Sequence, residues 1–263
     1  MQKYVMTDST HFSLNDEAQE HQERQEHQAR IDLAACFRWF ARLNMHESVA
    51  NHFSASVSDD GSKFLINPKW QPFSTIKASD LLLVDTANPD EAVLANIDPT
   101  AWAIHGQIHL LKPDIKCVLH LHPIYTTVIS TLKDPVIKPI DQNTARYFNR
   151  VNYDTCYQGM ADTNAEGARL AGLLGNRSRL MMGNHGVLIA SHSIGVAFDD
   201  MYTIERCCQV LAMAYATHQP LNLIPDAIAE KTAQDWESIE DFSEAHLAGI
   251  KKILLAQEPD FVD

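Results

Sequence analysis

Two histidines at the end of an apolar run carry the first chemical signal in the sequence. His120 and His122 flank Leu121 in a segment that predicts a β-strand, and Pro123 ends it. Side chains two residues apart point to the same face of a strand, so both imidazoles are expected side by side, with Cα atoms roughly 6–7 Å apart. Two nitrogen ligands of one metal ion could be spaced in this way. The alternative is a pair of ordinary strand histidines.

A third histidine strengthens the metal interpretation. His185 follows a second apolar run and is flanked by Gly183 and Gly186. Glycines on both sides let the backbone bend and approach other groups closely. The motif lies just before a helix that Ser193 is expected to cap. An Asn-His-Gly motif has little meaning alone, and its weight comes from following the His-x-His pair.

A further pair of histidines lies on a predicted helix. Asp98 is a good N-cap and Pro99 is tolerated in the first turn, while Pro113 ends the helix. Within it, His105 and His109 are four residues apart and therefore share one face. A functional role and a hydrogen-bonded core position are both compatible with this spacing.

The remaining pattern predicts one mixed α/β unit. Residues 1–30 are polar and are expected to form an N-terminal arm. Residues 31–220 carry amphipathic helices, alternating strands and a hairpin turn at Asp60-Gly61, with no linker that divides them. Residues 221–263 are expected to form a helical extension that packs on the same domain.

Composition excludes several classes of protein. The chain has 263 residues with a formal net charge of −13, which opposes binding to nucleic acid and to anionic membrane surfaces. It has no apolar run long enough to span a bilayer and no visible secretory signal. Its five cysteines form no Cys-x-x-Cys motif and predict buried, reduced thiols, so we expect a cytoplasmic protein.

The ordered motifs resemble those of the class II aldolase/adducin family. They are, in chain order, Val49-Ala-Asn-His-Phe-Ser54, Phe64-Leu-Ile-Asn-Pro68, Asp80-Leu-Leu-Leu-Val84, Lys112-Pro-Asp114, His120-Leu-His122, Asn184-His-Gly186 and the helix 197–212. The similarity spans roughly residues 30–218. Their order along the chain is specific, although no single motif is.

The resemblance implies a fold, an assembly and a cofactor. The implied fold is a three-layer α/β/α arrangement around a central, largely antiparallel mixed sheet, and the implied assembly is a homo-oligomer, in many members a tetramer. A divalent metal, usually zinc, would be bound by His120, His122 and His185. Such a metal polarises a carbonyl and stabilises the enediolate that carbon–carbon cleavage generates.

The sequence departs from the aldolase pattern at several positions. The aldolases use a glutamate as general acid/base where this chain has Ala101, and alanine cannot move a proton. Trp70 replaces an expected glycine in a phosphate-binding loop, and Pro99-Thr100 replaces a serine pair. His52 stands where the aldolases tend to have asparagine. These departures argue against a sugar-phosphate aldolase.

Other side chains could supply the missing chemistry. His105 lies one turn after Ala101 and is a candidate catalytic residue. Asp141 or Gln142 lies about where the aldolases place a tyrosine that reaches a neighbouring site, and Asp141 is the second catalytic candidate. His52 is a candidate substrate contact.

Three functions remain open at this point. The favoured hypothesis is a metal-dependent lyase that cleaves or decarboxylates a small carbonyl or keto-acid substrate through a metal-stabilised enolate. A non-haem-iron oxidative decarboxylase on the same fold is the first alternative, because three histidines can also bind Fe(II). A non-catalytic, adducin-like binding protein is the second, although the chain ends in a short acidic segment, Gln257–Asp263, rather than a basic tail.

Overall fold

A seven-stranded sheet forms the centre of the molecule. The computed structural model describes residues 14–239 and 241–263. The strands are β1 (His52–Ser56), β2 (Lys63–Ile66), β3 (Leu82–Asp85), β4 (Cys117–Leu121), β5 (Asn152–Asp154), β6 (Arg179–Met182) and β7 (Gly186–Ser191). Their order is β3-β2-β1-β4-β7-β6-β5, and every neighbouring pair is antiparallel except β5 and β6. The predicted largely antiparallel mixed sheet is confirmed.

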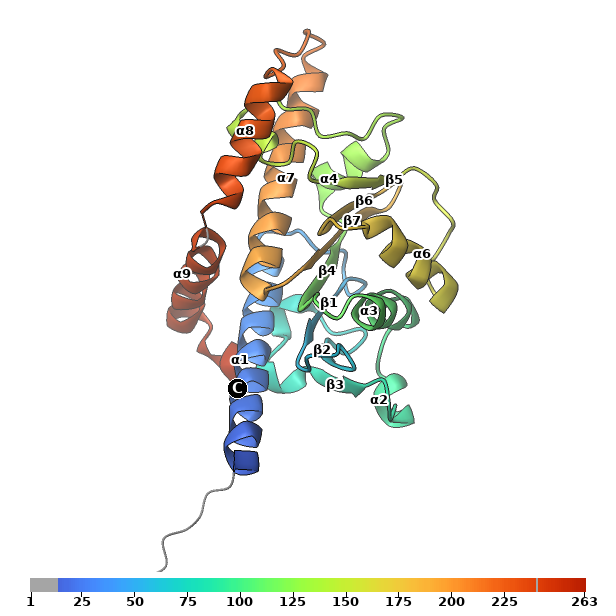
Figure 1. Cartoon of the computed structure of the whole chain (residues 1–263), viewed down its shortest axis with the longest axis vertical. Coiled ribbons are helices and arrows are strands. Elements are labelled where there is room, and N and C mark those ends of the chain that lie inside the picture. The colour runs from blue at the N-terminus through green and yellow to red at the C-terminus, as the bar shows by residue number, and fades with distance from the viewer. Residues whose placement is uncertain (1–13, 240) are drawn as a thin grey trace, which may run out of the picture.

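Helices cover both faces of this sheet. They are α1 (Leu14–Arg42), α2 (Glu91–Leu94), α3 (Pro99–Leu111), α4 (Ile124–Ser130), α5 (Gln142–Arg146), α6 (Asn164–Leu174), α7 (Ile194–Ala216), α8 (Asp226–Glu237) and α9 (Phe242–Gln257). Figure 1 shows α1, α7 and α9 on one side of the sheet and α3 and α6 on the other. The fold is therefore the three-layer α/β/α arrangement that the sequence predicted.

Strand β4 separates two apolar cores. Cys117, Leu119 and Leu121 face the core that includes residues of α1, α7 and α9. Val118 faces the second core, formed largely by α3 and α6. This alternation confirms the period-two prediction, and it places His120 on the α3 side of the sheet.

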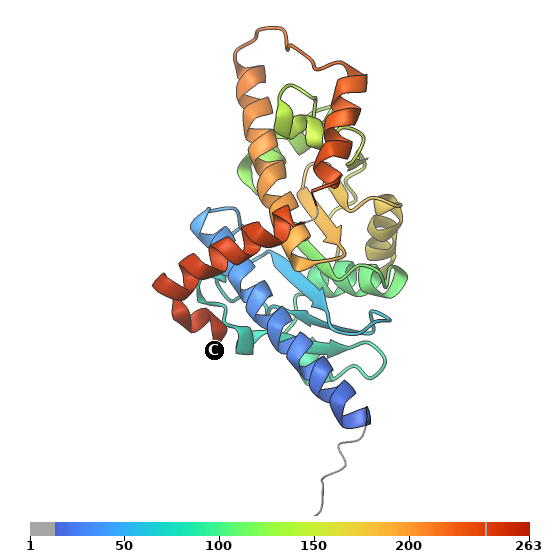
Figure 2. The same cartoon turned by 60° about the vertical axis from the view of Figure 1, so that its left-hand side comes forward.

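The C-terminal segment packs against α1. Arg38 of α1 forms ion pairs with Glu258 at 3.2 Å and with Asp260 at 2.8 Å. Phe261 is fully buried, and Figure 2 shows α9 crossing α1. The predicted boundary after residue 30 falls inside α1, which runs without interruption from Leu14 to Arg42. Residues 1–13 of the predicted arm lie outside the described part.

Two further expectations concern compartment and thiols. Within residues 14–239 and 241–263, no helix combines the length and apolarity needed to cross a membrane. All five cysteines are free, and four of them are buried as predicted. The prediction is wrong for Cys156, which is exposed because it lies in the loop after β5 rather than in a strand or helix.

Candidate metal centre

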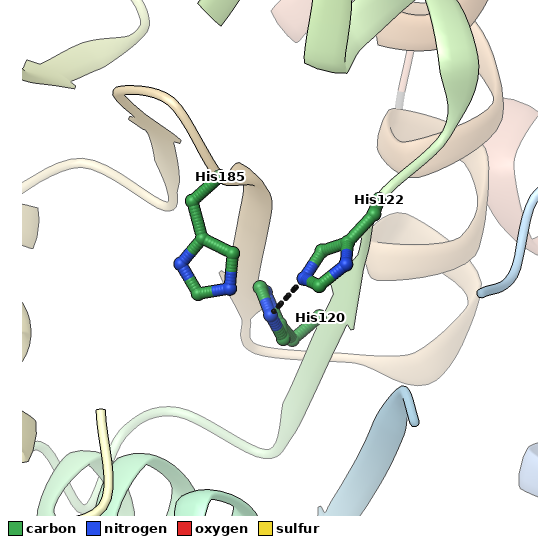
Figure 3. A group of neighbouring side chains, drawn as sticks. All are labelled: His120, His122 and His185. Atoms are coloured by element: carbon green, nitrogen blue, oxygen red, sulfur yellow. Dashed lines mark hydrogen bonds between the residues drawn. The ribbon is translucent and has the colours of Figure 1, made fainter. Parts of the chain in front are cut away.

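The three predicted metal ligands converge in the structure. His120 lies on β4, His122 follows directly after that strand, and His185 lies on the turn between β6 and β7. Each offers a ring nitrogen, and these nitrogens all lie within 4.8 Å of one another. Figure 3 shows the three rings turned toward a common point. Strand pairing brings them together, because β4 and β7 are neighbours in the sheet.

Hydrogen bonding directs the lone pair of His120 toward the other two rings. Nδ1 of His120 donates to the carbonyl oxygen of Val187 at 3.1 Å, so Nε2 carries the lone pair. That Nε2 lies 3.0 Å from Nε2 of His122 (Figure 3). A histidine ligand whose other nitrogen donates to a backbone carbonyl is the usual arrangement around protein-bound metals. The donor set and its surroundings are therefore compatible with a divalent ion.

The turn that carries His185 requires its glycines. A Cβ atom at Gly186 would lie 2.4 Å from the carbonyl oxygen of Leu121 and 2.8 Å from Cδ2 of His122. A Cβ atom at Gly183 would lie 2.5 Å from the carbonyl oxygen of Asp154. Only glycine allows both approaches, so these residues hold His185 close to the end of β4.

Burial keeps the three imidazoles neutral. Loss of solvation lowers the pKa of His120 and His122, and it lowers the pKa of His185 to about 4. Mutual repulsion adds to the shift, since each ring would be charged beside another. Neutral imidazole is the form that binds metal, so these residues need not lose protons first near pH 7.

The position of His122 is supported from the other face of the sheet. Glu205 of α7 accepts hydrogen bonds from the backbone N–H groups of Tyr125 and Thr126 at 3.0 and 2.8 Å. These groups belong to the first turn of α4, which begins two residues after His122. A carboxylate at a helix N-terminus is stabilising, so Glu205 anchors the segment that follows the ligand. Burial raises the pKa of this carboxyl group.

His52, the predicted substrate contact, lies beside the three candidate metal ligands. It faces His120 across the β1–β4 pair, and the two ring centroids are 5.1 Å apart. Its Nδ1 is 2.8 Å from Nε2 of His105, the predicted catalytic residue. His105 is fully buried, and its Nδ1 is 2.6 Å from the hydroxyl of Ser54. The structure thus places His105 behind His52 rather than facing the three converging histidines.

Asp141 lies in a different environment. It is the N-cap of α5, and its carboxylate accepts from the backbone N–H of Thr144 at 2.7 Å and from the Thr144 hydroxyl at 2.8 Å. These contacts describe a capping box within one segment. Among the residues that the structure describes, no contact joins the Asp141 side chain to the three histidines.

The positions that depart from the aldolase pattern are also visible. Ala101 is buried in an apolar cluster with Phe64 and Ile66. Trp70 has a φ of 65°, a backbone conformation that favours glycine, and its side chain is 59% exposed. The backbone at Trp70 therefore keeps a glycine-like conformation, but a large ring projects from it.

Sequence reasoning missed several neighbours of the site. The ring of Tyr157 lies 6.2 Å from that of His185, centroid to centroid. Arg169 forms ion pairs with Asp154 at 2.6 Å and with Glu166 at 2.7 Å. The negative charges of both carboxylates partly oppose the lowering of the His185 pKa by burial. These residues come from a loop, a strand and a helix that no local pattern connects.

The chain is similar to several known proteins. The family model described as the class II aldolase and adducin N-terminal domain matches residues 31–212. A Pseudomonas aeruginosa protein with "aldolase class 2" in its name is 34% identical over 209 residues, covering 77% of this chain and 78% of the relative. The 4-hydroxy-3-prenylphenylpyruvate oxygenase/4-hydroxy-3-prenylbenzoate synthase of Streptomyces roseochromogenus is 29% identical over 238 residues, covering 85% and 84%. The crystal structure of an aldolase II superfamily protein from Pseudomonas syringae has a TM-score of 0.82 at 28% identity, covering 91% and 96%.

Proposed function

The chain belongs to the class II aldolase and adducin family, and from this premise we propose that it is a metal-dependent carbon–carbon lyase. Its substrate would be a small carbonyl compound or keto acid. His120, His122 and His185 would bind one divalent metal, zinc in our proposal. When bound, the metal would stabilise negative charge that develops on a substrate oxygen as a carbon–carbon bond breaks.

The convergence of three neutral imidazoles is the observation that carries this proposal. Their nitrogens lie within 4.8 Å of one another, and the carbonyl of Val187 fixes the tautomer of His120. Three protein ligands leave a coordination position for substrate, which is the pattern of catalytic rather than structural zinc. A purely structural core would gain nothing from three largely buried imidazoles whose nitrogens converge.

The reaction we propose is aldol cleavage or decarboxylation of a substrate without a phosphate group. Ala101 supplies no acid/base, and the exposed ring of Trp70 occupies the loop where a glycine is expected to approach phosphate. Decarboxylation suits this site because the departing carboxylate needs no base to remove a proton first. His52, beside His120, is the proposed substrate contact.

Oxidative decarboxylation is the second candidate, and one relative favours it. The Streptomyces protein that is 29% identical is named as an oxygenase of a phenylpyruvate, which is a keto acid. The same three histidines would then bind iron rather than zinc.

Metal analysis separates these possibilities. Purified protein without a tag would be analysed by inductively coupled plasma mass spectrometry, with His120→Ala as the test variant and His192→Ala, at an exposed histidine, as the matched control. Near one zinc per chain, lost only in His120→Ala, would support the lyase. Iron together with oxygen consumption would favour the oxidative reaction. Failure to bind any metal after reconstitution would overturn both proposals and leave a binding role.

We also propose a homotetramer. Large apolar side chains are exposed, including Ile124, two residues after His122, at 60% and Met160, in the loop after β5, at 75%. An exposed apolar surface of this kind is typical of subunit contacts. The proposed acid/base role of Asp141 requires such an assembly, because within one chain its side chain caps α5. Light scattering during size-exclusion chromatography would give the assembly mass directly, and a monomer would contradict this proposal.

A further inference from the structure

A buried chain of hydrogen bonds runs behind the metal centre. It connects the carbonyl of Ile115 with His109 at 3.3 Å and His109 with Ser54 at 2.7 Å. It continues from Ser54 to His105 at 2.6 Å and from His105 to His52 at 2.8 Å. The three imidazoles and the hydroxyl are all buried. The chain therefore ends at the ring that lies beside the metal ligand His120.

The direction of the first two bonds follows from the carbonyl. A carbonyl oxygen only accepts, so Nδ1 of His109 must carry a proton and donate to Ile115. A neutral imidazole has one N–H, so Nε2 of His109 accepts. The Ser54 hydroxyl is the group at that nitrogen, and it therefore donates to His109.

The same logic fixes the remaining bonds. The Ser54 hydroxyl has one proton and gives it to His109, so its oxygen must accept from Nδ1 of His105. Nε2 of His105 then carries the lone pair and accepts from Nδ1 of His52. Every proton from Ile115 to His52 is placed by this sequence of donors and acceptors.

The last nitrogen of this hydrogen-bond series, Nε2 of His52, receives no proton from another member of the series. Its neighbour is the Thr100 hydroxyl at 3.3 Å. That hydroxyl donates to the carboxylate of Asp98 at 2.5 Å, which is the shorter and charge-assisted bond. Thr100 has only one hydroxyl proton, so Nε2 of His52 is left with a lone pair that no group on these elements satisfies.

Burial keeps the two inner rings of this hydrogen-bond chain neutral. Loss of solvation lowers the pKa of His109 to about 4 and also lowers the pKa of His105, so each of these rings carries one proton near pH 7. Nδ1 of His52 must then donate, because Nε2 of His105 accepts.

We propose that this chain holds His52 as the Nδ1–H tautomer, so that Nε2 accepts a hydrogen bond from a hydroxyl group of the substrate beside the metal. The inference rests on the proposed function, because it takes the substrate to be bound at His120, His122 and His185. It adds the substrate class, which is a carbonyl or carboxyl compound that carries a hydroxyl group close to the metal-binding oxygen. His105, Ser54 and His109 are positioning residues that act through His52.

The chemical consequence is selection by hydrogen-bond donors. A substrate hydroxyl would satisfy the lone pair on Nε2 of His52. A keto or ether oxygen at the same place would put two acceptors face to face, and an unsatisfied buried acceptor is costly. Rotating the His52 ring would not remove this cost, because it would break the hydrogen bond between Nδ1 of His52 and His105.

The first test reads the tautomer directly. Protein labelled with ¹⁵N-histidine would be studied by two-bond ¹⁵N–¹H correlation spectroscopy, with and without zinc, and His52 would be assigned from the signals missing in His52→Ala. We expect a proton on Nδ1 of His52 in both forms. Ser54→Ala should produce a mixture of tautomers at His52, whereas His192→Gln should remove only the His192 signals and leave those of His52 unchanged. A proton on Nε2 of His52 in the wild-type protein would overturn the inference.

The second test measures selectivity with two small probes. Glycolate offers a hydroxyl beside its carboxylate, and methoxyacetate offers an ether at the same place. We expect the affinity ratio of glycolate to methoxyacetate to be about tenfold larger for the zinc-loaded wild type than for Ser54→Ala. His52→Gln should retain most of the ratio, because its amide can donate to His105 and still accept from the hydroxyl. Equal ratios in wild type and Ser54→Ala would contradict the inference.

The two proposals fail in different ways. Absence of metal at the three histidines would overturn the proposed lyase, yet the tautomer of His52 can still be read in metal-free protein. Conversely, full zinc content with the opposite tautomer would leave the lyase standing and remove the hydroxyl selection. Thermal unfolding and zinc content of each variant would show that Ser54→Ala is folded when its ratio is measured.

Discussion

Two groups of buried histidines lie next to each other, and they use the same side chain in opposite ways. In the metal centre, His120, His122 and His185 direct ring nitrogens toward a common point. In the neighbouring series of hydrogen bonds, which runs from Ile115 to His52, both ring nitrogens of His105 and of His109 lie within hydrogen-bond distance of protein groups. Burial lowers the pKa in both groups, so the pKa alone does not distinguish them. The two groups differ in whether the nitrogen lone pairs accept hydrogen bonds within the protein.

This difference teaches how buried histidines acquire a function. A nitrogen that is paired within the protein orients its neighbour, whereas a nitrogen left with a lone pair can bind a metal or a ligand. His52 belongs to both groups, since Nδ1 is paired with His105 and Nε2 is free to accept. The comparison leads to four predictions, which we order from the largest expected effect to the smallest.

The acid dependence of stability is the largest expected effect. The pKa of His109 is lowered to about 4 in the folded protein, while the unfolded side chain titrates near 6.5. The unfolded state therefore binds more protons between these values, and stability is full above pH 6.5 and falls as the pH drops toward 4. For His109 alone this amounts to about 3 kcal/mol. Urea unfolding of metal-free protein at several pH values measures the effect.

A substitution isolates the contribution of one ring. In His109→Gln the slope of unfolding free energy against pH between 6.5 and 4 should decrease by about 1.4 kcal/mol per pH unit, because one proton fewer is taken up on unfolding. The exposed His192 is the matched control, and His192→Gln should leave the slope unchanged. An unchanged slope in His109→Gln would show that His109 titrates normally in the folded protein.

Gly186→Ala tests the metal centre by geometry alone. The added Cβ would lie 2.4 Å from the Leu121 carbonyl oxygen, so β7 must shift away from His122. We expect a loss of roughly 1–3 kcal/mol in unfolding free energy. Because His185 moves with the turn, zinc affinity should fall about 10- to 100-fold, as when other supporting groups of metal ligands are changed. Zinc titration with a competing chelator measures the affinity.

The control for Gly186→Ala is a glycine with open space. Gly172 lies in α6, and a Cβ there would meet nothing within 4 Å. Gly172→Ala should raise stability by up to about 1 kcal/mol, because alanine is the better helix former. Its zinc affinity should match the wild type. Equal behaviour of the two variants would mean that the close approach at Gly186 does not position His185.

Much of the fold and the metal centre could be predicted from the sequence, for a local reason. His120 lies in a strand whose period is visible in five residues, His122 follows it directly, and glycines flanking His185 mark a tight turn. Strand alternation also places His52 and Ser54 on one face of β1. What alternation cannot give is the partner strand and helix, so the contact of Ser54 with His105 and His109 was not predicted.

The remaining parts of the site depend on tertiary packing. Tyr157 lies in a loop, and Arg169 reaches Asp154 only because α6 packs near β5. Glu205 caps a helix that is distant in the sequence. No periodic pattern records such contacts, because they connect segments whose separation is set by the whole sheet. His105 was predicted as a catalytic group from its spacing to Ala101. Spacing within a helix shows which residues share a face, but not which groups pack against that face.

Ser54→Ala tests the buried chain of hydrogen bonds without changing the candidate metal ligands. The variant removes the acceptor for His105 and the donor for His109, leaving two buried polar groups unpaired. We expect a loss of about 1–3 kcal/mol in unfolding free energy with zinc content unchanged. Ser56, two residues along the same strand, donates to a backbone carbonyl at 2.9 Å and is partly exposed. Ser56→Ala should cost less than about 1 kcal/mol, so equal losses would argue against the buried chain.

Thr100→Val gives the smallest expected effect and tests the His52 end of the hydrogen-bond series. If the Thr100 hydroxyl donates to Asp98, as the 2.5 Å distance indicates, it contributes no proton to His52. Valine has nearly the same shape, and the Thr100 backbone N–H still donates to Asp98, so the start of α3 is kept. We expect a loss of about 1 kcal/mol or less from the missing hydroxyl bond. The His52 tautomer should stay the same, and a switch of its proton to Nε2 in ¹⁵N spectra would mean that Thr100, not Ile115, sets the direction of the chain.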